Sequence, residues 1–227
     1  MYNDRWPVLQ VALDLVSADR ALEIASQASE AGAQWLEAGS PLIMSEGVGV
    51  VRRLKTSFPD KVVVADLKLL EQGYVLAEMT SANGADVITV SALSSRRNVS
   101  EAIEGAKKNG AKVMIDLLWV RRSEELDRAK TAVQLGADYV CFHMGSDDIP
   151  FAPDSLAGRQ KDIESAISAI SVPVAVAGSL NDSSAAEMAK AGAKIIAVGA
   201  YITGSANVRQ ATTQLLKSIG APQGRKA

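Results

Sequence analysis

The sequence is poor in cysteine, histidine and membrane-length apolar runs, and each shortage excludes a class of protein. A single cysteine, Cys141, cannot form an internal disulfide, so we expect a fold held by an apolar core. No Cys/His cluster has the spacing of a zinc site. No apolar stretch reaches the roughly 18 to 20 residues of a membrane span. Because Cys141 lies within an apolar run, it is expected to be buried in a protein of a reducing compartment.

A strong charge of either sign is also missing. The net charge is −2, and acidic and basic residues are interleaved along the chain, which argues against a nucleic-acid-binding surface. The first residues, MYNDRWP, lack the charged and then apolar profile of a signal peptide. We therefore expect a cytoplasmic protein that binds neither nucleic acid nor membranes.

A short repeat is the most informative feature that is present. Five times a glycine is followed by an alanine and then by an apolar run, at spacings close to multiples of roughly 26 residues. Each glycine ends an amphipathic segment, where a left-handed helix cap is favoured, and each apolar run is typical of a strand buried on both faces. The five pairs are Gly32-Ala33, Gly84-Ala85, Gly110-Ala111, Gly136-Ala137 and Gly192-Ala193.

Counting the apolar runs predicts the fold. Eight runs begin near Val8, Gln34, Lys61, Asp86, Lys112, Asp138, Pro173 and Lys194. Helical patterns lie between them, over residues 18–31, 46–57, 101–109, 124–135 and 184–191. Eight strand-then-helix units in 227 residues predict an α/β fold of the (β/α)8 TIM-barrel type, in one domain. The barrel is expected over about residues 7–219, followed by a polar tail, 220–227. A doubly wound open sheet is the competitor, but no G-x-G-x-x-G follows the first strand.

In such a barrel the active site lies at the carboxyl ends of the strands, and polar side chains gather there. Six of the eight predicted strands carry them, and the last two strands end in Gly178 and Gly199. An isolated carboxylate at a strand end is often only a helix cap, but like charges raise one another's pKa unless a cation compensates them. The group therefore indicates a functional site, and its members are Asp14, Glu37, Ser40, Asp66, Lys68, Ser91, Asp116 and His143.

The residue types at this rim suggest divided roles. Glu37 and Asp66 fall on adjacent strands and offer hard oxygen ligands, which suit Mg²⁺ or Mn²⁺ acting as a Lewis acid. Lys68 is two residues from Asp66, so both side chains point to one face, where a protonated lysine can stabilise an oxyanion. Glycines after the last two strands let the backbone approach a phosphate, and the expected cradle is Gly178, Ser179, Gly199 and Ala200.

The blocks VALD, LEAGSPLIMSEG, VVVADLK, KVMIDL, FHMG, VPVAVAGS and AVGAYITGSA resemble, in order, the 3-hexulose-6-phosphate synthases. These belong to the orotidine 5′-phosphate decarboxylase suprafamily, and the likeness runs from about Trp6 to Leu216. Related 3-keto-L-gulonate-6-phosphate decarboxylases share most of the rim residues. They typically carry glutamate at the end of the fifth strand and arginine after the last strand's glycine, whereas this chain has Asp116 and Ala200, as in the synthases.

The resemblance implies a metal-dependent aldol reaction in which ribulose 5-phosphate loses a C1 proton and the resulting 1,2-enediolate attacks formaldehyde. It implies that Glu37 and Asp66 ligate the metal, that Lys68 stabilises the enediolate and that His143 shuttles the proton. Asp14 and Asp116 would bind substrate hydroxyls or orient Lys68, with Ser40 among the substrate-binding residues.

The resemblance also implies a homodimer whose sites are completed across the interface. The carboxylate that reaches the neighbouring site is the last residue of the family's D-x-K-x-x-D block, which here is Glu71 instead of aspartate. Two alternatives stay open beside the synthase. One is a decarboxylase that acts on 3-keto-L-gulonate 6-phosphate through the same enediolate. The other is a catalytically silent phosphosugar-binding protein, if the longer side chain of Glu71 spoils the geometry.

Overall fold

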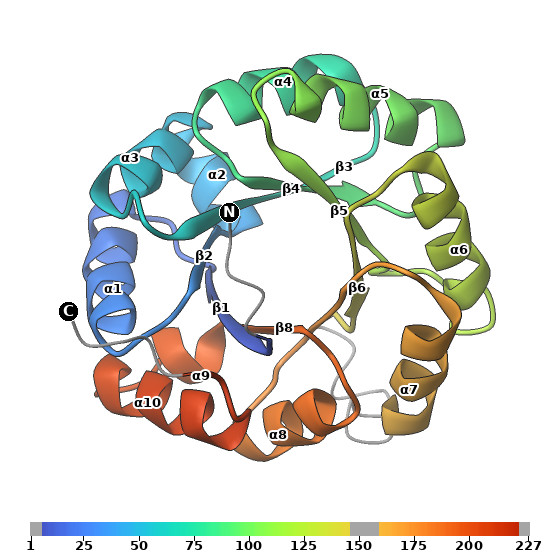
Figure 1. Cartoon of the computed structure of the whole chain (residues 1–227). Coiled ribbons are helices and arrows are strands. Elements are labelled where there is room, and N and C mark those ends of the chain that lie inside the picture. Colours follow the sequence, from blue (N-terminus) through green and yellow to red (C-terminus); the bar gives the residue numbers. More distant parts are fainter. Residues whose placement is uncertain (1–5, 146–158, 223–227) are drawn as a thin grey trace.

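A computed structural model describes residues 6–145 and 159–222 and shows a closed barrel of eight parallel strands (Figure 1). Every strand pairs with its neighbours in sequence order, and β1 pairs with β8 to close the ring. The predicted (β/α)8 fold is therefore confirmed. The strands are β1 (Val8–Leu13), β2 (Trp35–Ala38), β3 (Val62–Leu69), β4 (Val87–Ser91), β5 (Lys112–Asp116), β6 (Tyr139–His143), β7 (Val174–Ala177) and β8 (Ile195–Val198).

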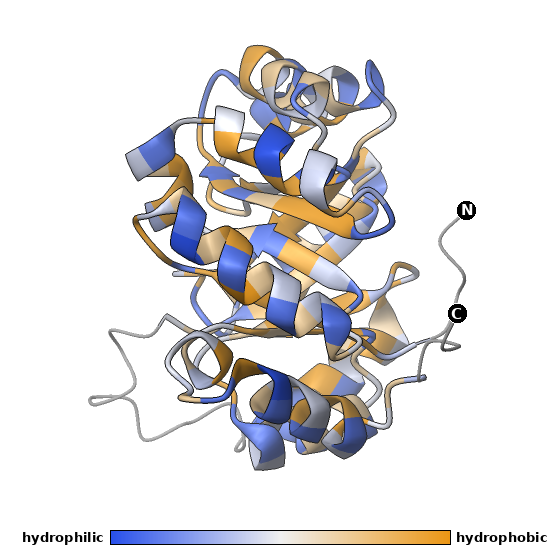
Figure 2. Ribbon diagram, turned by 90° about the vertical axis from the view of Figure 1, so that its left-hand side faces the viewer, coloured by the Kyte–Doolittle hydropathy of each residue, from blue (hydrophilic) through white to orange (hydrophobic). Residues whose placement is uncertain are grey.

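Helices surround the barrel, and Figure 1 shows them as an outer ring. Figure 2 shows hydrophobic residues concentrated along the strands and both hydrophilic and hydrophobic turns along the helices. The helices are α1 (Ala18–Glu30), α2 (Ser40–Glu46), α3 (Gly49–Ser57), α4 (Gly73–Ala82), α5 (Arg96–Lys107), α6 (Glu125–Leu135), α7 (Gln160–Ala169), α8 (Asp182–Lys190), α9 (Ala200–Thr203) and α10 (Val208–Ser218).

The core has two parts, as the alternation of side chains along a strand requires. Side chains that point outward pack against the helices in one large cluster that includes Leu9, Leu36 and Ile88. Side chains that point inward form a smaller cluster in the lower barrel, in which Trp35 and Tyr139 meet edge to face with ring centroids 5.5 Å apart. Above this apolar floor the inward-facing side chains are polar.

The glycine repeat has the conformational role predicted for it. All five glycines have positive φ, between +76° and +108°, and each follows a helix and precedes a strand. A side chain disfavours this backbone region, so glycine terminates each helix at low cost.

Two helix boundaries predicted from the pattern are wrong. The helix expected over 46–57 begins three residues later, at Gly49, and is α3; Gly47, with φ +72°, separates it from α2, which ends at Glu46. The helix expected from residue 101 begins at Arg96, since Ser95 caps it by accepting a hydrogen bond from the Asn98 N–H at 3.1 Å. Residues 1–5 of the N-terminal segment and 223–227 of the predicted tail lie outside the described residues.

Candidate active site

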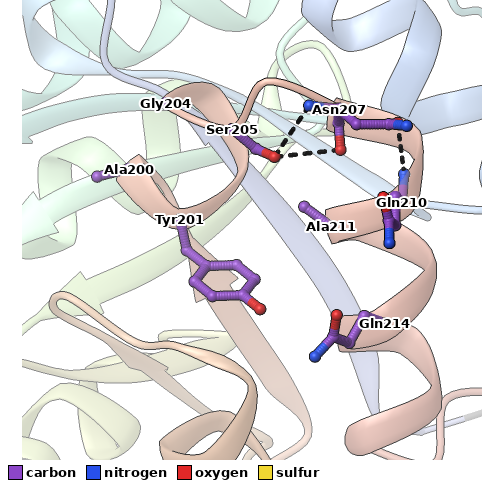
Figure 3. Close-up of a pocket in the computed structure, with 8 residues that line it drawn as sticks. All are labelled: Ala200, Tyr201, Gly204, Ser205, Asn207, Gln210, Ala211 and Gln214. Carbon is purple, nitrogen blue, oxygen red and sulfur yellow. Dashed lines mark hydrogen bonds between the residues drawn. The ribbon is translucent and has the colours of Figure 1, made fainter.

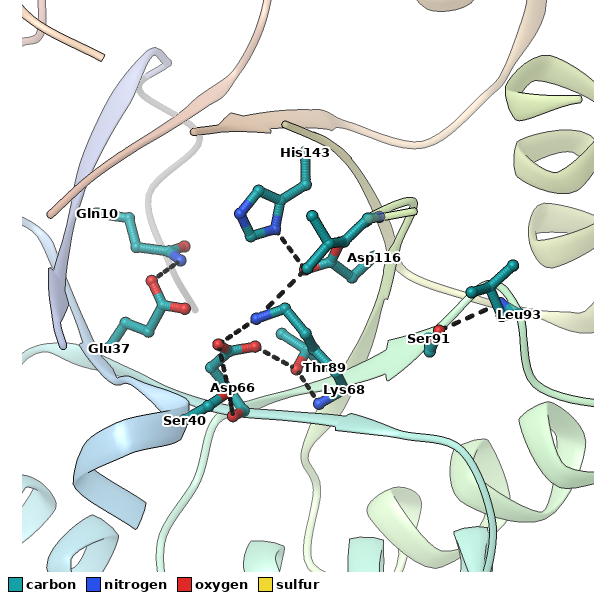
Figure 4. Close-up of polar contacts among 11 residues, drawn as sticks. Gln10, Glu37, Ser40, Asp66, Lys68, Thr89, Ser91, Leu93, Asp116 and His143 are labelled. Carbon is teal, nitrogen blue, oxygen red and sulfur yellow. Dashed lines mark hydrogen bonds and ion pairs between the residues drawn. The ribbon is translucent and has the colours of Figure 1, made fainter. Parts of the chain in front are cut away.

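The carboxyl ends of β3, β5 and β6 bring four predicted residues into one bonded network (Figure 4). The Lys68 ammonium bonds to Asp66 Oδ2 and lies 3.9 Å from Asp116 Oδ2. Asp116 Oδ2 is in turn 2.8 Å from His143 Nδ1, and Asp116 Oδ1 accepts a hydrogen bond from the Leu118 N–H at 2.8 Å. Asp66 and Asp116 are almost fully buried, so these bonds form in a medium of low polarity, where they are strong.

Lys68 reaches this position through an irregularity in β3. The pairing of β3 with β4 shifts between Ala65 and Leu69, and within the shift Lys68 has φ +44°. A lysine in the left-handed region is strained, and such strain persists only where the surroundings hold it. Here the Lys68 N–H donates to Thr89 Oγ1 at 2.9 Å in place of a strand carbonyl. Thus Asp66 and Lys68 do face the same space, but a bulge sets their geometry.

Asp66 is held from three sides. Thr89 Oγ1 donates to Asp66 Oδ1 at 2.8 Å, and Lys68 bonds the other oxygen. Ser40 Oγ, from the start of α2, lies 2.9 Å from Asp66 Oδ2 and 2.8 Å from the Asp66 main-chain oxygen. Ser40 therefore contacts the site as predicted, and in this chain its hydroxyl orients Asp66.

The pKa values of two groups at this rim are shifted in opposite directions. Burial by itself lowers the pKa of Lys68, but the negative charges of Asp66 and Asp116 outweigh it and raise that pKa above its ordinary value. Burial by itself raises the pKa of Asp116, but His143 and Lys68 outweigh it and lower that pKa. The pair therefore stays charged near neutral pH, an ammonium beside a carboxylate.

Glu37 lies beside this network and forms no ion pair with any of the described residues, although the charge of Lys68 acts on it from a distance. It is 8% exposed, and its Oε2 accepts a hydrogen bond from Gln10 Nε2 at 2.8 Å. Burial, together with the charges of Asp66 and Asp14, raises the pKa of Glu37 to about 8. Gln10 Oε1 is buried and has no hydrogen-bond partner among the described residues. Unpaired hard oxygens next to Asp66 form a donor set that suits Mg²⁺ or Mn²⁺.

Asp14 directly follows β1, between the glycines that follow β2 and β8. The residue as a whole is exposed, but its carboxylate is close to two glycines: a Cβ at Gly39 would lie 2.1 Å from Asp14 Oδ1, and one at Gly199 would lie 3.2 Å from Oδ2. Partial loss of solvent and the charge of Asp66 raise the pKa of Asp14. The Asp14 carboxylate can occupy this position because residues 39 and 199 are glycines and have no side chain there.

The glycine ends of β7 and β8 also lie at this rim, as predicted. Gly178 has φ +118°, and a Cβ there would lie 2.2 Å from the Met144 main-chain oxygen, so only glycine fits. Ser179 follows with φ +45° and is exposed. Ala200 begins the short α9, directly after Gly199.

The structure does not bring Glu71 to the other predicted residues. Glu71 is exposed in the turn between β3 and α4, and it forms no hydrogen bond or ion pair with the described residues. The turn itself is anchored, because Ser94 Oγ donates to the Leu70 oxygen at 3.0 Å and the Gly73 N–H donates to Asn98 Oδ1 at 2.7 Å. Glu71 is therefore an exposed carboxylate on a turn whose backbone is anchored on both sides of it.

Sequence analysis missed Gln10 and Thr89, which hold Glu37 and Asp66 respectively. Each is a polar residue inside an apolar strand, on the inward face shared with Asp14 on β1 and with Ser91 on β4. Their spacing of two or four residues from a predicted rim residue, which places them on the same face of the strand, was the signal that could have identified them. Ser91, by contrast, accepts a hydrogen bond from the Leu93 N–H at 3.2 Å within its own turn.

A separate pocket lies on the outer helical layer, between α9 and α10 (Figure 3). Its volume is about 310 Å³, and its lining includes Tyr201, Gln210 and Gln214 but no lysine, arginine or carboxylate. Gln214 Nε2 donates to Asp182 Oδ2 at 2.7 Å. The pocket has no group that would perform acid–base chemistry, so the candidate site stays at the barrel rim.

This chain is similar in sequence and in fold to known proteins. The chain is 33% identical to a 3-hexulose-6-phosphate synthase from Mycobacterium gastri over 211 residues, which is 93% of this chain and 99% of that protein. A crystal structure of a 3-hexulose-6-phosphate synthase superposes with a TM-score of 0.86 at 32% identity, covering 93% of this chain and 99% of the other.

A 3-keto-L-gulonate-6-phosphate decarboxylase from Vibrio cholerae O1 biovar El Tor is 21% identical, with a TM-score of 0.82, and covers 95% of this chain and 98% of its own. At this identity it supports the fold alone. None of the helices in the described ranges is long and apolar enough to cross a membrane. Residues 7–215 match the family model of orotidine 5′-phosphate decarboxylases and the HUMPS proteins, and this chain belongs to that family.

Proposed function

We propose that this protein is a carbon–carbon lyase of the 3-hexulose-6-phosphate synthase type, which condenses formaldehyde with D-ribulose 5-phosphate. The observation that carries the proposal is the bonded network of Asp66, Lys68, Asp116 and His143, found in a chain with one-third identity to a synthase over 99% of that enzyme's length. The decarboxylase alternative is weaker, because solved decarboxylases of that type are only 21 to 22% identical to this chain.

Proton transfer follows from the contact between His143 and Asp116. If Nδ1–H donates to Asp116 Oδ2, then Nε2 keeps its lone pair and can accept the C1 proton of the sugar. Asp116 fixes this tautomer and stabilises the imidazolium that forms. The same Nε2–H can later return the proton to the new hydroxyl, so one group serves both directions of the reaction.

Charge stabilisation follows from Lys68. Loss of the C1 proton places negative charge on the enediolate oxygens, and a fixed ammonium near those oxygens lowers the barrier. Lys68 meets this need because its raised pKa keeps it protonated and because Asp66, Asp116 and the bonded backbone limit its movement. Preorganisation of this kind is worth most where the site is buried.

Glu37 and Asp66 are the residues that would hold Mg²⁺ or Mn²⁺. The fit is supported by the raised pKa of Glu37 and the unpaired oxygen of Gln10, since both mark a place where a positive charge would be stabilising. When bound, the cation supplies Lewis-acid polarisation of the substrate oxygens. Asp14 is proposed to bind a substrate hydroxyl, and the backbone at Gly178, Ser179, Gly199 and Ala200 to hold the phosphate.

We further propose a homodimer. Four exposed apolar side chains lie around the ends of β3 and β4 and on α4. They are Leu70, Val75, Met79 and Leu93, and we call them the β3–β4 patch. Leu70 and Leu93 adjoin, because Ser94 bonds the Leu70 oxygen. A partner on this patch would bring the neighbouring Glu71 toward a second site. The lone, buried Cys141 supports a location in the reducing cytoplasm.

The deciding experiment supplies purified protein with ribulose 5-phosphate, formaldehyde and Mg²⁺ and measures hexulose 6-phosphate. We expect turnover by the wild type, strong loss in Lys68→Met, and wild-type rates in Lys190→Met, an exposed lysine at the end of α8. The decarboxylase would be favoured instead if the protein released CO₂ from 3-keto-L-gulonate 6-phosphate and did not condense formaldehyde with ribulose 5-phosphate. Binding of ribulose 5-phosphate without turnover of either would indicate the silent protein.

A further inference from the structure

Cys141 is a buried reactive group that the proposed reaction does not use. It lies on β6 two residues before His143, so both side chains point into the barrel, and it pairs in register with Asp116 of β5. The Cys141 sulfur, an imidazole nitrogen of His143 and a carboxylate oxygen of Asp116 all lie within 4.8 Å of one another. Three different ligand types thus converge at the boundary between the apolar floor and the polar rim.

This donor set suits a different cation from the one proposed for Glu37 and Asp66. Thiolate, imidazole and carboxylate bind Zn²⁺ at about 2.0 to 2.3 Å, which places tetrahedral ligand atoms about 3.3 to 3.7 Å apart. The separations here extend from 2.8 Å, between Asp116 Oδ2 and His143 Nδ1, to no more than 4.8 Å, so side-chain rotation would be needed to bring the three atoms to that spacing. The His143 side chain is 20% exposed, so a cation can enter from the rim and keep a fourth position open.

The surrounding charges also favour entry of a cation. Asp14, Glu37 and Asp66 lie at the same rim, and their only lysine partner there, among the described residues, is Lys68. The Lys68 ammonium bonds Asp66 directly and is 3.9 Å from Asp116 Oδ2, the oxygen that lies 2.8 Å from His143 Nδ1, so Lys68 is closely paired with Asp66 and only distantly with Asp116.

We propose that Asp116, Cys141 and His143 form a second metal site, one that takes a thiophilic divalent cation such as Zn²⁺ or Cd²⁺ and inhibits the enzyme. On binding, the Cys141 thiol loses its proton to solvent and the sulfur becomes a ligand, with no change of oxidation state. The cation also takes a His143 nitrogen and an Asp116 oxygen, which are then lost to proton transfer. Inhibition rests on the proposed function, whereas binding does not.

The binding test uses Cd²⁺ alone as the probe. A thiolate bound to Cd²⁺ gives an ultraviolet charge-transfer band, and because Cys141 is the only cysteine, the band reports this site unambiguously. We expect the band to saturate at one Cd²⁺ per chain in the wild type and to be missing in both Cys141→Ser and Cys141→Ala. A wild type that develops no band would overturn the proposal, whatever the protein's activity.

The activity test adds Zn²⁺ to enzyme saturated with Mg²⁺. Cys141 is outside the reacting groups, so Cys141→Ser should keep the wild-type rate without Zn²⁺ and need about 100-fold more Zn²⁺ for half inhibition. Equal Zn²⁺ sensitivity in the two proteins would refute the inhibitory role, because Zn²⁺ would then act at Glu37 and Asp66. If synthase activity is missing altogether, the proposed function fails while the Cd²⁺ band still decides the site.

Discussion

Thr89→Val tests whether the geometry of Lys68 depends on one buried hydroxyl. Thr89 is 3% exposed and has two bonds: its Oγ1 donates to Asp66 Oδ1 at 2.8 Å and accepts from the Lys68 N–H at 2.9 Å. Valine keeps the volume and removes both bonds. A strained backbone N–H and a buried carboxylate oxygen then lose their partners at once.

The expected cost is large for a change of so few atoms. An unsatisfied backbone group costs about 1 to 3 kcal/mol, and a bond to a charged group contributes about 1.5 to 3 kcal/mol. Burying an extra methyl group offsets about 0.8 kcal/mol of this. We therefore expect the free energy of unfolding to fall by about 2 to 4 kcal/mol. At about 2 to 4 °C per kcal/mol in a chain of this size, Tm should fall by roughly 5 to 15 °C.

Catalysis should suffer as well, because Lys68 and Asp66 lose their fixed positions. A displacement of such groups costs up to about 100-fold in rate, so we expect kcat/KM to fall by about 10- to 100-fold. Urea unfolding and steady-state synthase kinetics measure the two effects. Thr89→Ser keeps the hydroxyl and should retain most of the activity.

Thr212→Val is the matched control, because Thr212 is equally buried but donates only to the Val208 oxygen within α10, at 2.8 Å. It should change the free energy of unfolding by less than about 1 kcal/mol and leave kcat/KM unchanged. If Thr89→Val and Thr212→Val behaved alike in both assays, Thr89 would have no special part in positioning Lys68, and the reasoning would be refuted.

Three further predictions follow from the rim. Glu37→Gln should fold normally and lose the heat of Mg²⁺ binding in calorimetry, and retention of that heat would place the metal elsewhere. Gly178→Ala should lower the free energy of unfolding by about 2 kcal/mol or more, whereas Gly110→Ala, at φ +76° with open space around it, should cost only the backbone strain. Glu71→Asp should raise synthase kcat/KM by no more than about tenfold, or about 1.4 kcal/mol. An inert wild type and an active Glu71→Asp variant would show that this chain has left the synthase function.

The fold could be predicted from the sequence because its signals are local. Glycine is needed wherever φ is positive after a helix, and a strand covered on both faces must be apolar along its length. All eight strands therefore begin within one residue of their predicted starts. The helix expected over 46–57 ends where predicted, but it starts three residues later, at Gly49, since Gly47 ends α2 and separates it from α3.

The site could be predicted where a polar residue lies at or just after the end of an apolar run. Asp66, Asp116 and His143 were found in this way because every parallel strand delivers its last residues to one rim. Thr89 and Gln10 lie earlier in their strands, where burial hides them among apolar neighbours. Their roles depend on which strand lies beside which, information that a single strand's sequence does not hold.

The cost of this rim to the fold favours catalysis over silent binding. A protein that only holds a sugar phosphate needs hydroxyl and backbone donors, which the glycine ends of β7 and β8 can offer. It needs neither a lysine at φ +44° nor a buried glutamate whose pKa is about 8, and both features oppose folding. Both would become useful if the proposed cation bound and negative charge developed on the substrate. The strained Lys68 and the uncompensated Glu37 are therefore explained together by enolisation of a bound sugar phosphate, and by nothing that binding alone requires.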